Sequence, residues 1–157
     1  MFNIVLYQPE IPPNTGNIAR LCVAANSFLH LIRPLGFSLS NSHLRRAGLD
    51  YWKYLNYRIY DKWEDFLSKN KGAKIYLVTK KMGFVYWNVS FKCSDFFIFG
   101  SETKGLPEKL LSRYKENCIT IPMPGKVRSL NLSDAVSIII YEALRQNYRI
   151  NIASPKL

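Results

Sequence analysis

The sequence predicts an α/β protein with one parallel sheet and helices on both faces of that sheet. Short runs rich in β-branched and aromatic residues alternate with segments whose apolar residues recur at helical spacing. This alternation is typical of parallel strands joined by crossover helices. The chain has 157 residues, of which 48% are apolar, so we expect one core and a single domain over residues 1–157.

The first expected elements are a strand and a helix. Residues Phe2 to Tyr7 read FNIVLY, which predicts a buried strand, and a proline-rich turn follows. Asn14 or Thr15 is expected to cap the next helix. The apolar stripe of that helix, at i, i+3, i+4 and i+7, consists of Ile18, Leu21, Cys22 and Ala25.

The rest of the chain repeats this pattern. Further strands are expected at Leu29 to Arg33, Tyr57 to Tyr60, Lys74 to Thr79, Asp95 to Gly100 and Cys118 to Pro122. Asp61 and Glu64 form a capping-box pattern ahead of a helix that ends near Lys69. The other helical segments expected are a short turn at Leu44 to Ala47, a helix from Leu106-Pro107 to about Tyr114, and the longest helix at Leu132 to Asn147.

Positive charge dominates the composition. The chain has 22 Lys and Arg against 11 Asp and Glu, a formal net charge of +11. Such an excess favours a polyanionic partner through counterion release and electrostatic steering. Aromatic and basic residues interleave between residues 51 and 63, a pattern that can stack unpaired bases. A solvated surface over core aromatics explains the same composition, so charge alone leaves RNA binding open.

Several protein classes are disfavoured. No apolar run approaches the roughly 20 residues that span a bilayer, and the N-terminus lacks the basic and small-residue parts of a secretory signal. Cys22, Cys93 and Cys118 stand far apart, without the spacing of a metal site or a disulfide framework. We therefore expect a cytoplasmic protein with reduced thiols, no bound metal and no membrane contact.

Three loops that follow expected strands carry unusual polar sequence. Ligands of parallel sheets lie beyond the carboxyl ends of the strands. The loops are Asn14 to Arg20 (NTGNIAR), Phe99 to Pro107 (FGSETKGLP) and Ile121 to Val136 (IPMPGKVRSLNLSDAV). A capped helix with a solvated arginine would explain the first, and an ordinary strand-to-helix turn the second. The third gathers more polar residues at a helix entrance than the single one that a cap needs.

Together these segments closely resemble the three signature motifs of the SPOUT RNA 2'-O-methyltransferases. Within that superfamily, FNIVLYQPEIPPNTGNIARLC at the N-terminus and LRRAGLDYW from Leu44 to Trp52 resemble the small tRNA (cytidine(34)-2'-O)-methyltransferases. The resemblance runs from Phe2 to about Arg145, with the motifs in the family's order. It implies that the C-terminal part of the sheet forms a deep trefoil knot, which strand patterns alone would not suggest.

The resemblance also implies a cofactor, S-adenosylmethionine, bound in the knot by main-chain groups of three loops. The positions that it assigns to the cofactor are Val78, Thr79, Gly100, Ile121, Ser129 and Leu130. Apolar side chains suit this role because adenine needs a flat, dry slot.

The implied reaction moves a methyl group from a sulfonium to the ribose 2'-hydroxyl of nucleotide 34, a cytidine or a modified uridine. The resemblance places Arg20 at the nucleophile, in a site shaped by Asn14, Glu102, Ser129 and Asn131. A hydroxyl must lose its proton as it attacks, yet arginine keeps its own proton up to a pKa above about 12. We therefore expect Arg20 to stabilise the developing alkoxide. A histidine base is not expected, because His30 is predicted in a strand and His43 in a loop outside the motifs.

The last expected helix offers a surface for a partner. Ile138 and Tyr141 lie roughly opposite its core stripe, and with the resemblance they become the candidate contact of a homodimer that builds each RNA site from two subunits. The expected substrate is the anticodon stem-loop of tRNA, recognised without an appended RNA-binding domain. Candidate RNA contacts are Arg45, Arg46, Tyr51 and Lys126. Two alternatives remain, namely ribose methylation of another RNA such as rRNA and a non-catalytic RNA-binding relative.

Overall fold

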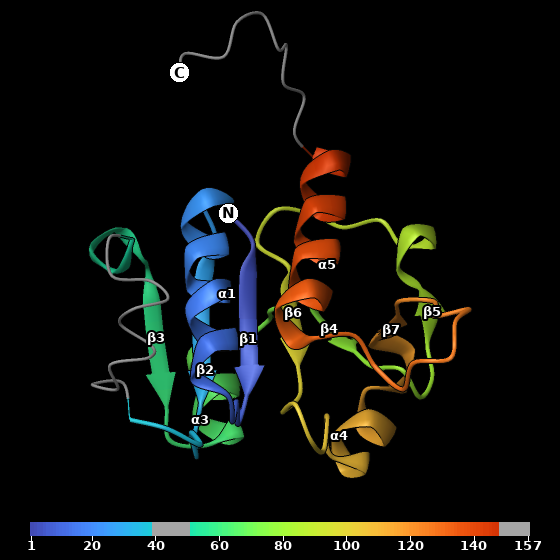
Figure 1. Ribbon diagram of the computed structural model, residues 1–157, viewed down its shortest axis with the longest axis horizontal. Helices are drawn as coiled ribbons and strands as arrows, with labels where there is room; N and C mark the ends of the chain where they lie inside the picture. The colour runs from blue at the N-terminus through green and yellow to red at the C-terminus, as the bar shows by residue number, and fades with distance from the viewer. Residues whose placement is uncertain (39–50, 148–157) are drawn as a thin grey trace, which may run out of the picture.

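A parallel sheet of seven strands forms the centre of the computed structural model, which describes residues 1–38 and 51–147 (Figure 1). The strand order is β3-β2-β1-β6-β4-β7-β5, and every described pairing is parallel. The strands are β1 (Asn3–Tyr7), β2 (Phe28–Ile32), β3 (Tyr57–Tyr60), β4 (Ile75–Val78), β5 (Phe84–Val85), β6 (Phe96–Phe99) and β7 (Cys118–Thr120).

Helices cover both faces of the sheet. The α-helices are α1 (Pro12–Ala24), α3 (Trp63–Lys69), α4 (Glu108–Arg113) and α5 (Leu132–Asn147), and the 3₁₀ turns are η1 (Trp52–Tyr54), η2 (Tyr86–Asn88) and η3 (Lys115–Asn117). Figure 1 shows α1 and α5 on the near face, where they pack against each other. The expected α/β architecture with a parallel sheet and helices on both faces is therefore confirmed.

Two hydrophobic layers follow from the alternation of side chains along the strands. In β1, Ile4 and Leu6 face α1 and α5, whereas Val5 between them faces α3 and α4. The four residues of β6 alternate in the same way and all are buried. This near-continuous apolar strand is typical of a sheet that is covered on both faces.

The sheet order brings the loops of interest to one edge. Leu6, Phe99, Val78 and Ile119 occupy one row across β1, β6, β4 and β7. Because all four strands run in the same direction, the chain leaves the sheet just beyond this row in each of them. The loops after β4, β6 and β7 therefore start side by side, and the loop after β1 starts next to them.

Helix starts differ from the sequence expectation at two places. Helix α1 begins at Pro12 with Ile11 as its N-cap, because Pro12 and Pro13 occupy the first positions, where no N–H is needed. Asn14 is therefore inside the helix rather than its cap. The capping box expected at Asp61 is wrong: Lys62 is the N-cap of α3 and no side chain bonds there. Asp61 instead lies 3.5 Å from the guanidinium of Arg33.

The other expected elements that lie in the described residues are confirmed to within a few residues. Strand β5 was not expected, because two residues carry no periodicity. It is held against β7 at a point where only glycine fits, since a Cβ on Gly83 would lie 2.3 Å from the carbonyl oxygen of Cys118. The turn expected at Leu44 to Ala47 lies outside the described residues.

Candidate active site

Asn14 joins three segments that lie far apart in the sequence. Its side chain is buried in the first turn of α1. Its Nδ2 donates a hydrogen bond of 3.0 Å to Oε1 of Glu102, in the loop after β6. Its Oδ1 accepts a hydrogen bond of 3.0 Å from Nδ2 of Asn131, just before α5. One buried amide therefore sets the positions of α1, the Glu102 loop and the start of α5 relative to one another.

The side chain of Glu102, from the loop after β6, lies against the N-terminus of α1. Its Oε2 accepts a hydrogen bond of 2.8 Å from the main-chain N–H of Glu10, and its Oε1 accepts one of 3.2 Å from that of Ile11. With Asn14, three N–H donors share this carboxylate, and its negative charge faces the positive end of the helix dipole. The geometry assigns Glu102 to positioning, since its oxygens are already used as acceptors.

Asn131 connects this network to α5. Its Oδ1 accepts hydrogen bonds from the main-chain N–H of Ser133 at 2.8 Å and from the Ser133 hydroxyl at 2.7 Å, an N-cap arrangement. The structure thus brings together Asn14, Glu102 and Asn131 of the expected catalytic set. Ser129 is not part of this network, because it is exposed in the preceding loop and its hydroxyl has no hydrogen-bond partner in the described chain.

Arg20 is exposed on α1 and stands apart from that network. It follows Asn14 by six residues, which is about 9 Å along a helix axis. Its Cζ lies over the ring of Tyr51, 4.9 Å from the ring centroid. No ion pair of Arg20 occurs among the residues that the structure describes. Within residues 1–38 and 51–147, the guanidinium thus has an aromatic neighbour and no carboxylate partner.

A second side chain reinforces the Glu102 loop and was not identified from the sequence. The carboxylate of Glu10 accepts a hydrogen bond of 2.7 Å from the Thr103 hydroxyl and one of 3.2 Å from the Thr103 main-chain N–H. Glu10 and Thr103 are 93 residues apart, and no local pattern marks this pairing.

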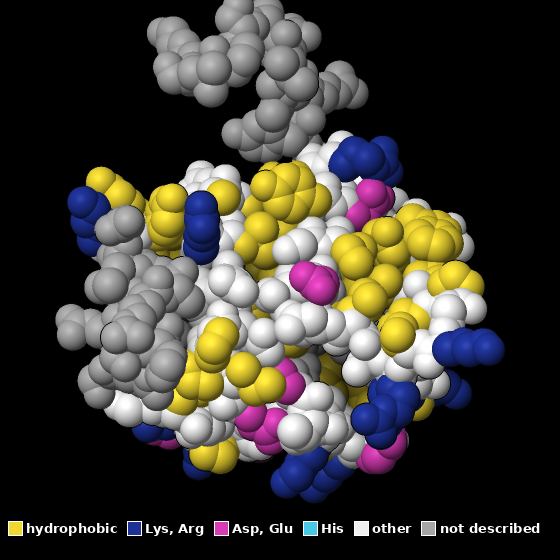
Figure 2. All heavy atoms as spheres, in the orientation of Figure 1, with side chains coloured by type: hydrophobic (Ala, Val, Ile, Leu, Met, Phe, Trp, Pro, Cys, Tyr) yellow, Lys and Arg dark blue, Asp and Glu magenta, His cyan; other side chains and the backbone are white. Residues whose placement is uncertain are grey.

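The positions expected to hold S-adenosylmethionine surround the carboxyl ends of β6, β4 and β7. Val78, Gly100, Ile121 and Leu130 are half-buried there. Nζ of Lys80 donates a hydrogen bond of 2.9 Å to the carbonyl of Arg128, which ties the loop after β4 to the loop after β7. In Figure 2 the surface is hollowed at this edge, below the start of α5. Half-buried apolar side chains and main-chain groups therefore lie side by side at this edge.

Two of the expected cofactor positions have other roles in the structure. The main-chain N–H of Thr79 donates to the carbonyl of Ile119 at 2.9 Å, so it is not free for a ligand. A Cβ on Gly100 would lie 2.1 Å from the carbonyl carbon of Gly105, so glycine here permits the tight return of its own loop. Gly105 has a φ of +69°, the left-handed conformation that glycine adopts without strain.

His30 has no place in the site. It lies in β2, as predicted, with Nδ1 2.8 Å from the hydroxyl of Tyr60 and Nε2 3.2 Å from Oδ1 of Asn3. Burial, with a smaller contribution from Arg58, lowers the pKa of His30 to about 4. A neutral, buried imidazole with both nitrogens engaged holds the core together.

Of the candidate RNA contacts, Tyr51 and Lys126 are exposed, whereas Arg45 and Arg46 lie outside the described residues. Within the described chain, no three His, Cys, Asp or Glu side chains are placed to hold a metal ion. None of the helices in that part is long and apolar enough to cross a bilayer.

Known proteins match this chain along nearly its whole length. The profile of the SpoU rRNA Methylase family matches residues 1–141. A Listeria monocytogenes protein named provisionally as a tRNA (cytidine(34)-2'-O)-methyltransferase is 51% identical over 147 residues, covering 92% of this chain and 87% of its own. The tRNA (cytidine(34)-2'-O)-methyltransferase of Methylovorus glucosotrophus is 46% identical over 148 residues, covering 94% and 96%.

A solved structure agrees with the sequence relatives. It is described as giving structural insights into the 2-OH methylation of C/U34 on tRNA. It is 47% identical, has a TM-score of 0.90, and covers 93% of this chain and 95% of its own.

Proposed function

The chain belongs to the SpoU rRNA Methylase family, and we propose that it methylates the ribose 2'-hydroxyl of nucleotide 34 of tRNA, using S-adenosylmethionine. The observation that carries this proposal is the hydrogen-bonded network of Asn14, Glu102 and Asn131, which joins the three motif segments, with Arg20 about 9 Å further along α1. Relatives that are 46% and 51% identical over nearly the whole chain carry the name of this activity.

The cofactor is held by the loops beyond β4, β6 and β7. We assign its binding to Val78, Thr79, Gly100, Ile121, Ser129 and Leu130, through main-chain groups and an apolar slot for adenine. Thr79 would contribute its carbonyl, because its N–H is bonded to Ile119. When bound, S-adenosylmethionine supplies an electrophilic methyl group. The network around Asn14 fixes the loops after β6 and β7 relative to α1, since Glu102, Asn131 and Asn14 belong to these three segments.

Arg20 acts on the ribose. The 2'-hydroxyl is a weak nucleophile at neutral pH and loses its proton as it attacks. The guanidinium stabilises the negative charge that develops on the oxygen, because it keeps its proton and has no carboxylate partner in the described chain to neutralise it. The proton that the hydroxyl releases passes to a phosphate oxygen of the RNA beside Arg20.

The active form is proposed to be a homodimer. Tyr141 is 55% exposed on α5 and Ile138 is half-buried on the same helix. Figure 2 shows hydrophobic side chains gathered over this helix and over the region of β5, where Phe84 and Trp87 are also exposed. Tyr141→Arg would place a charge in this surface. We expect the variant to sediment as a monomer, and an unchanged dimer would refute the interface.

A trefoil knot and a cytoplasmic location complete the proposal. The knot is supported by the sheet order, in which β6 lies between β1 and β4 and β7 lies between β4 and β5. The close passage of Gly83 against Cys118 and the hydrogen bond from Lys80 to Arg128 hold these crossing segments together. A tRNA substrate and the free thiols of Cys22, Cys93 and Cys118 support the cytoplasm.

The decisive experiment is to map 2'-O-methyl groups on tRNA incubated with the protein and labelled S-adenosylmethionine. We expect label at nucleotide 34 and none on a matched tRNA that carries 2'-deoxyribose at that nucleotide. Label at another nucleotide, or on rRNA alone, would overturn the substrate. RNA binding without any binding of S-adenosylmethionine by calorimetry would indicate the non-catalytic RNA-binding relative.

A further inference from the structure

The surroundings of Arg20 differ from those of Arg33 and Arg145. Arg145 makes two hydrogen bonds to Glu142, at 2.8 and 2.9 Å, and Arg33 lies 3.5 Å from Asp61. Arg20 instead faces an aromatic ring, with Cζ 4.9 Å from the centroid of Tyr51. Its charge is attracted by the ring face, yet no negative group neutralises it within residues 1–38 and 51–147.

Tyr51 is held in place although 37% of its surface is exposed. Its carbonyl accepts a hydrogen bond of 2.9 Å from the N–H of Tyr54, closing the turn η1. Leu55, which follows this turn, is buried in the core beneath α1, and Trp52 packs against that core. η1 also contacts α1 directly. The turn that carries this ring is therefore fixed beside the helix that carries Arg20.

We propose that Tyr51 is a positioning residue that holds the guanidinium of Arg20 in its working orientation. The proposal rests on the proposed function for the role of Arg20, and on the structure for the contact itself. An aromatic face fixes the plane of a guanidinium without using its N–H donors, which point outward from the edge of the group.

This arrangement suits the chemistry better than an ion pair. A carboxylate partner would take two of the N–H donors and cancel the positive charge that the developing alkoxide needs. Stacking leaves both the donors and the charge for the RNA. It also reduces the number of side-chain rotamers that a long exposed arginine would otherwise sample before each reaction.

The contact is measured without substrate or cofactor by NMR of protein labelled with ¹⁵N-arginine. The Nε–Hε signal of Arg20 is identified by its loss in Arg20→Lys. We expect an upfield ring-current shift in the wild type, the same shift in Tyr51→Phe, and its loss in Tyr51→Leu. Tyr54→Leu is the matched control, because Tyr54 is an exposed neighbour whose ring faces Lys53. A shift retained in Tyr51→Leu would overturn the contact.

The role is measured by kinetics of tRNA methylation with the same variants. We expect kcat of Tyr51→Leu to fall about tenfold, as for a misplaced catalytic group, with an unchanged KM for tRNA. Tyr51→Phe should restore kcat, because it keeps the ring face. In an Arg20→Lys background, Tyr51→Leu should cause no comparable further loss, since Tyr51 acts through the guanidinium.

Other outcomes contradict the proposal in distinct ways. A raised KM for tRNA with unchanged kcat would show that the ring binds RNA instead. If Tyr51→Leu and Tyr51→Phe both had a lower melting temperature and lost kcat equally, Tyr51 would have a structural role. Absence of methylation by the wild type would overturn the proposed function and the catalytic purpose of Tyr51, while the NMR shift would still report the contact.

Discussion

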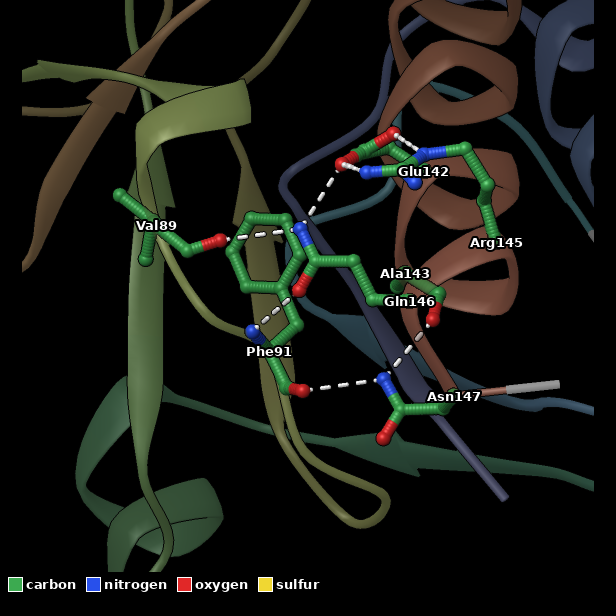
Figure 3. Close-up of polar contacts among 7 residues, drawn as sticks. All are labelled: Val89, Phe91, Glu142, Ala143, Arg145, Gln146 and Asn147. Atoms are coloured by element: carbon green, nitrogen blue, oxygen red, sulfur yellow. Dashed lines mark hydrogen bonds and ion pairs between the residues drawn. The ribbon is translucent and has the colours of Figure 1, made fainter. Parts of the chain in front are cut away.

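The two ends of α5 are each tied to distant parts of the chain by side-chain amides, but only the network at the C-terminal end includes an arginine. At the start, Asn131 bonds to Asn14, which bonds to Glu102. At the end, Gln146 and Asn147 bond to the segment that follows η2 (Figure 3). Similar residue types thus serve two purposes on one helix.

The C-terminal network is complete in itself. The N–H of Phe91 donates to Oε1 of Gln146 at 2.8 Å, and Nε2 of Gln146 donates to the carbonyl of Val89 at 3.0 Å. Nδ2 of Asn147 donates to the carbonyl of Phe91 at 2.9 Å. Glu142 accepts bonds from Arg145 and Gln146, so the arginine at this end is neutralised.

The network at the start of α5 differs from the C-terminal one because its carboxylate has no arginine partner. Its carboxylate, Glu102, is bonded to main-chain N–H groups and to Asn14 rather than to an arginine. Arg20, on the same helix as Asn14, rests on a ring. A polar network that pairs its charges stabilises the fold, whereas an arginine that has no carboxylate partner in the described part of the chain is suited to bind or stabilise an anion.

The comparison is tested most strongly by the two arginines. Arg20→Lys keeps the charge but loses the planar fork, so kcat for tRNA methylation should fall about 100-fold, with an unchanged melting temperature. Arg145→Lys is the matched control and should stay within about twofold of the wild type, because its exposed pair contributes little. Equal rates for wild type and Arg20→Lys would remove Arg20 from the reaction.

The next largest effect is expected at Asn14. Asn14→Ala deprives Glu102 and Asn131 of a partner in a buried setting, so the free energy of unfolding should fall by about 2 kcal/mol in urea titration. Activity should fall as well, because three segments lose their common contact. Asn17→Ala, at an exposed position of the same helix, serves as control. Activity retained in a destabilised Asn14→Ala would make this network purely structural.

A smaller change is expected at the other end of α5. Gln146→Ala leaves the N–H of Phe91 and the carbonyl of Val89 close to solvent, so the loss should be about 1 kcal/mol of unfolding free energy. The rate of methylation per folded molecule should not change. A selective loss of kcat in this variant would contradict the division between the two ends.

The smallest effect concerns pH. Hydrogen bonding from Arg145 lowers the pKa of Glu142 below its ordinary value of 4.5. A lowered pKa in the folded state means that the pair stabilises the protein above that ordinary value, and that this stabilisation is lost as pH falls through the lowered pKa. The difference in the free energy of unfolding between wild type and Glu142→Gln should thus shrink in acid, as measured by urea titration at neutral and acidic pH. A difference in unfolding free energy that grows in acid would contradict a stabilising pair between Glu142 and Arg145.

Much of the fold could be predicted from local patterns. The buried strands β1 and β6 and the long helix α5 lie close to where periodicity placed them. Errors arose where local signals compete. Two prolines moved the start of α1 ahead of Asn14, and Asp61 pairs with Arg33 rather than capping α3. Strand β5 is too short to show a period and exists because β7 pairs with it.

The sequence by itself determined the class of fold, the positive charge and the three polar loops, because these depend on composition and on short-range periodicity. Only the tertiary structure decided which of those polar residues meet. Asn14 and Asn131 are 117 residues apart, and no local rule pairs them. Their contact exists because the order β1-β6-β4-β7 aligns the carboxyl ends of the strands and packs α1 against α5. The packing of η1 against α1 likewise places Tyr51 beside Arg20.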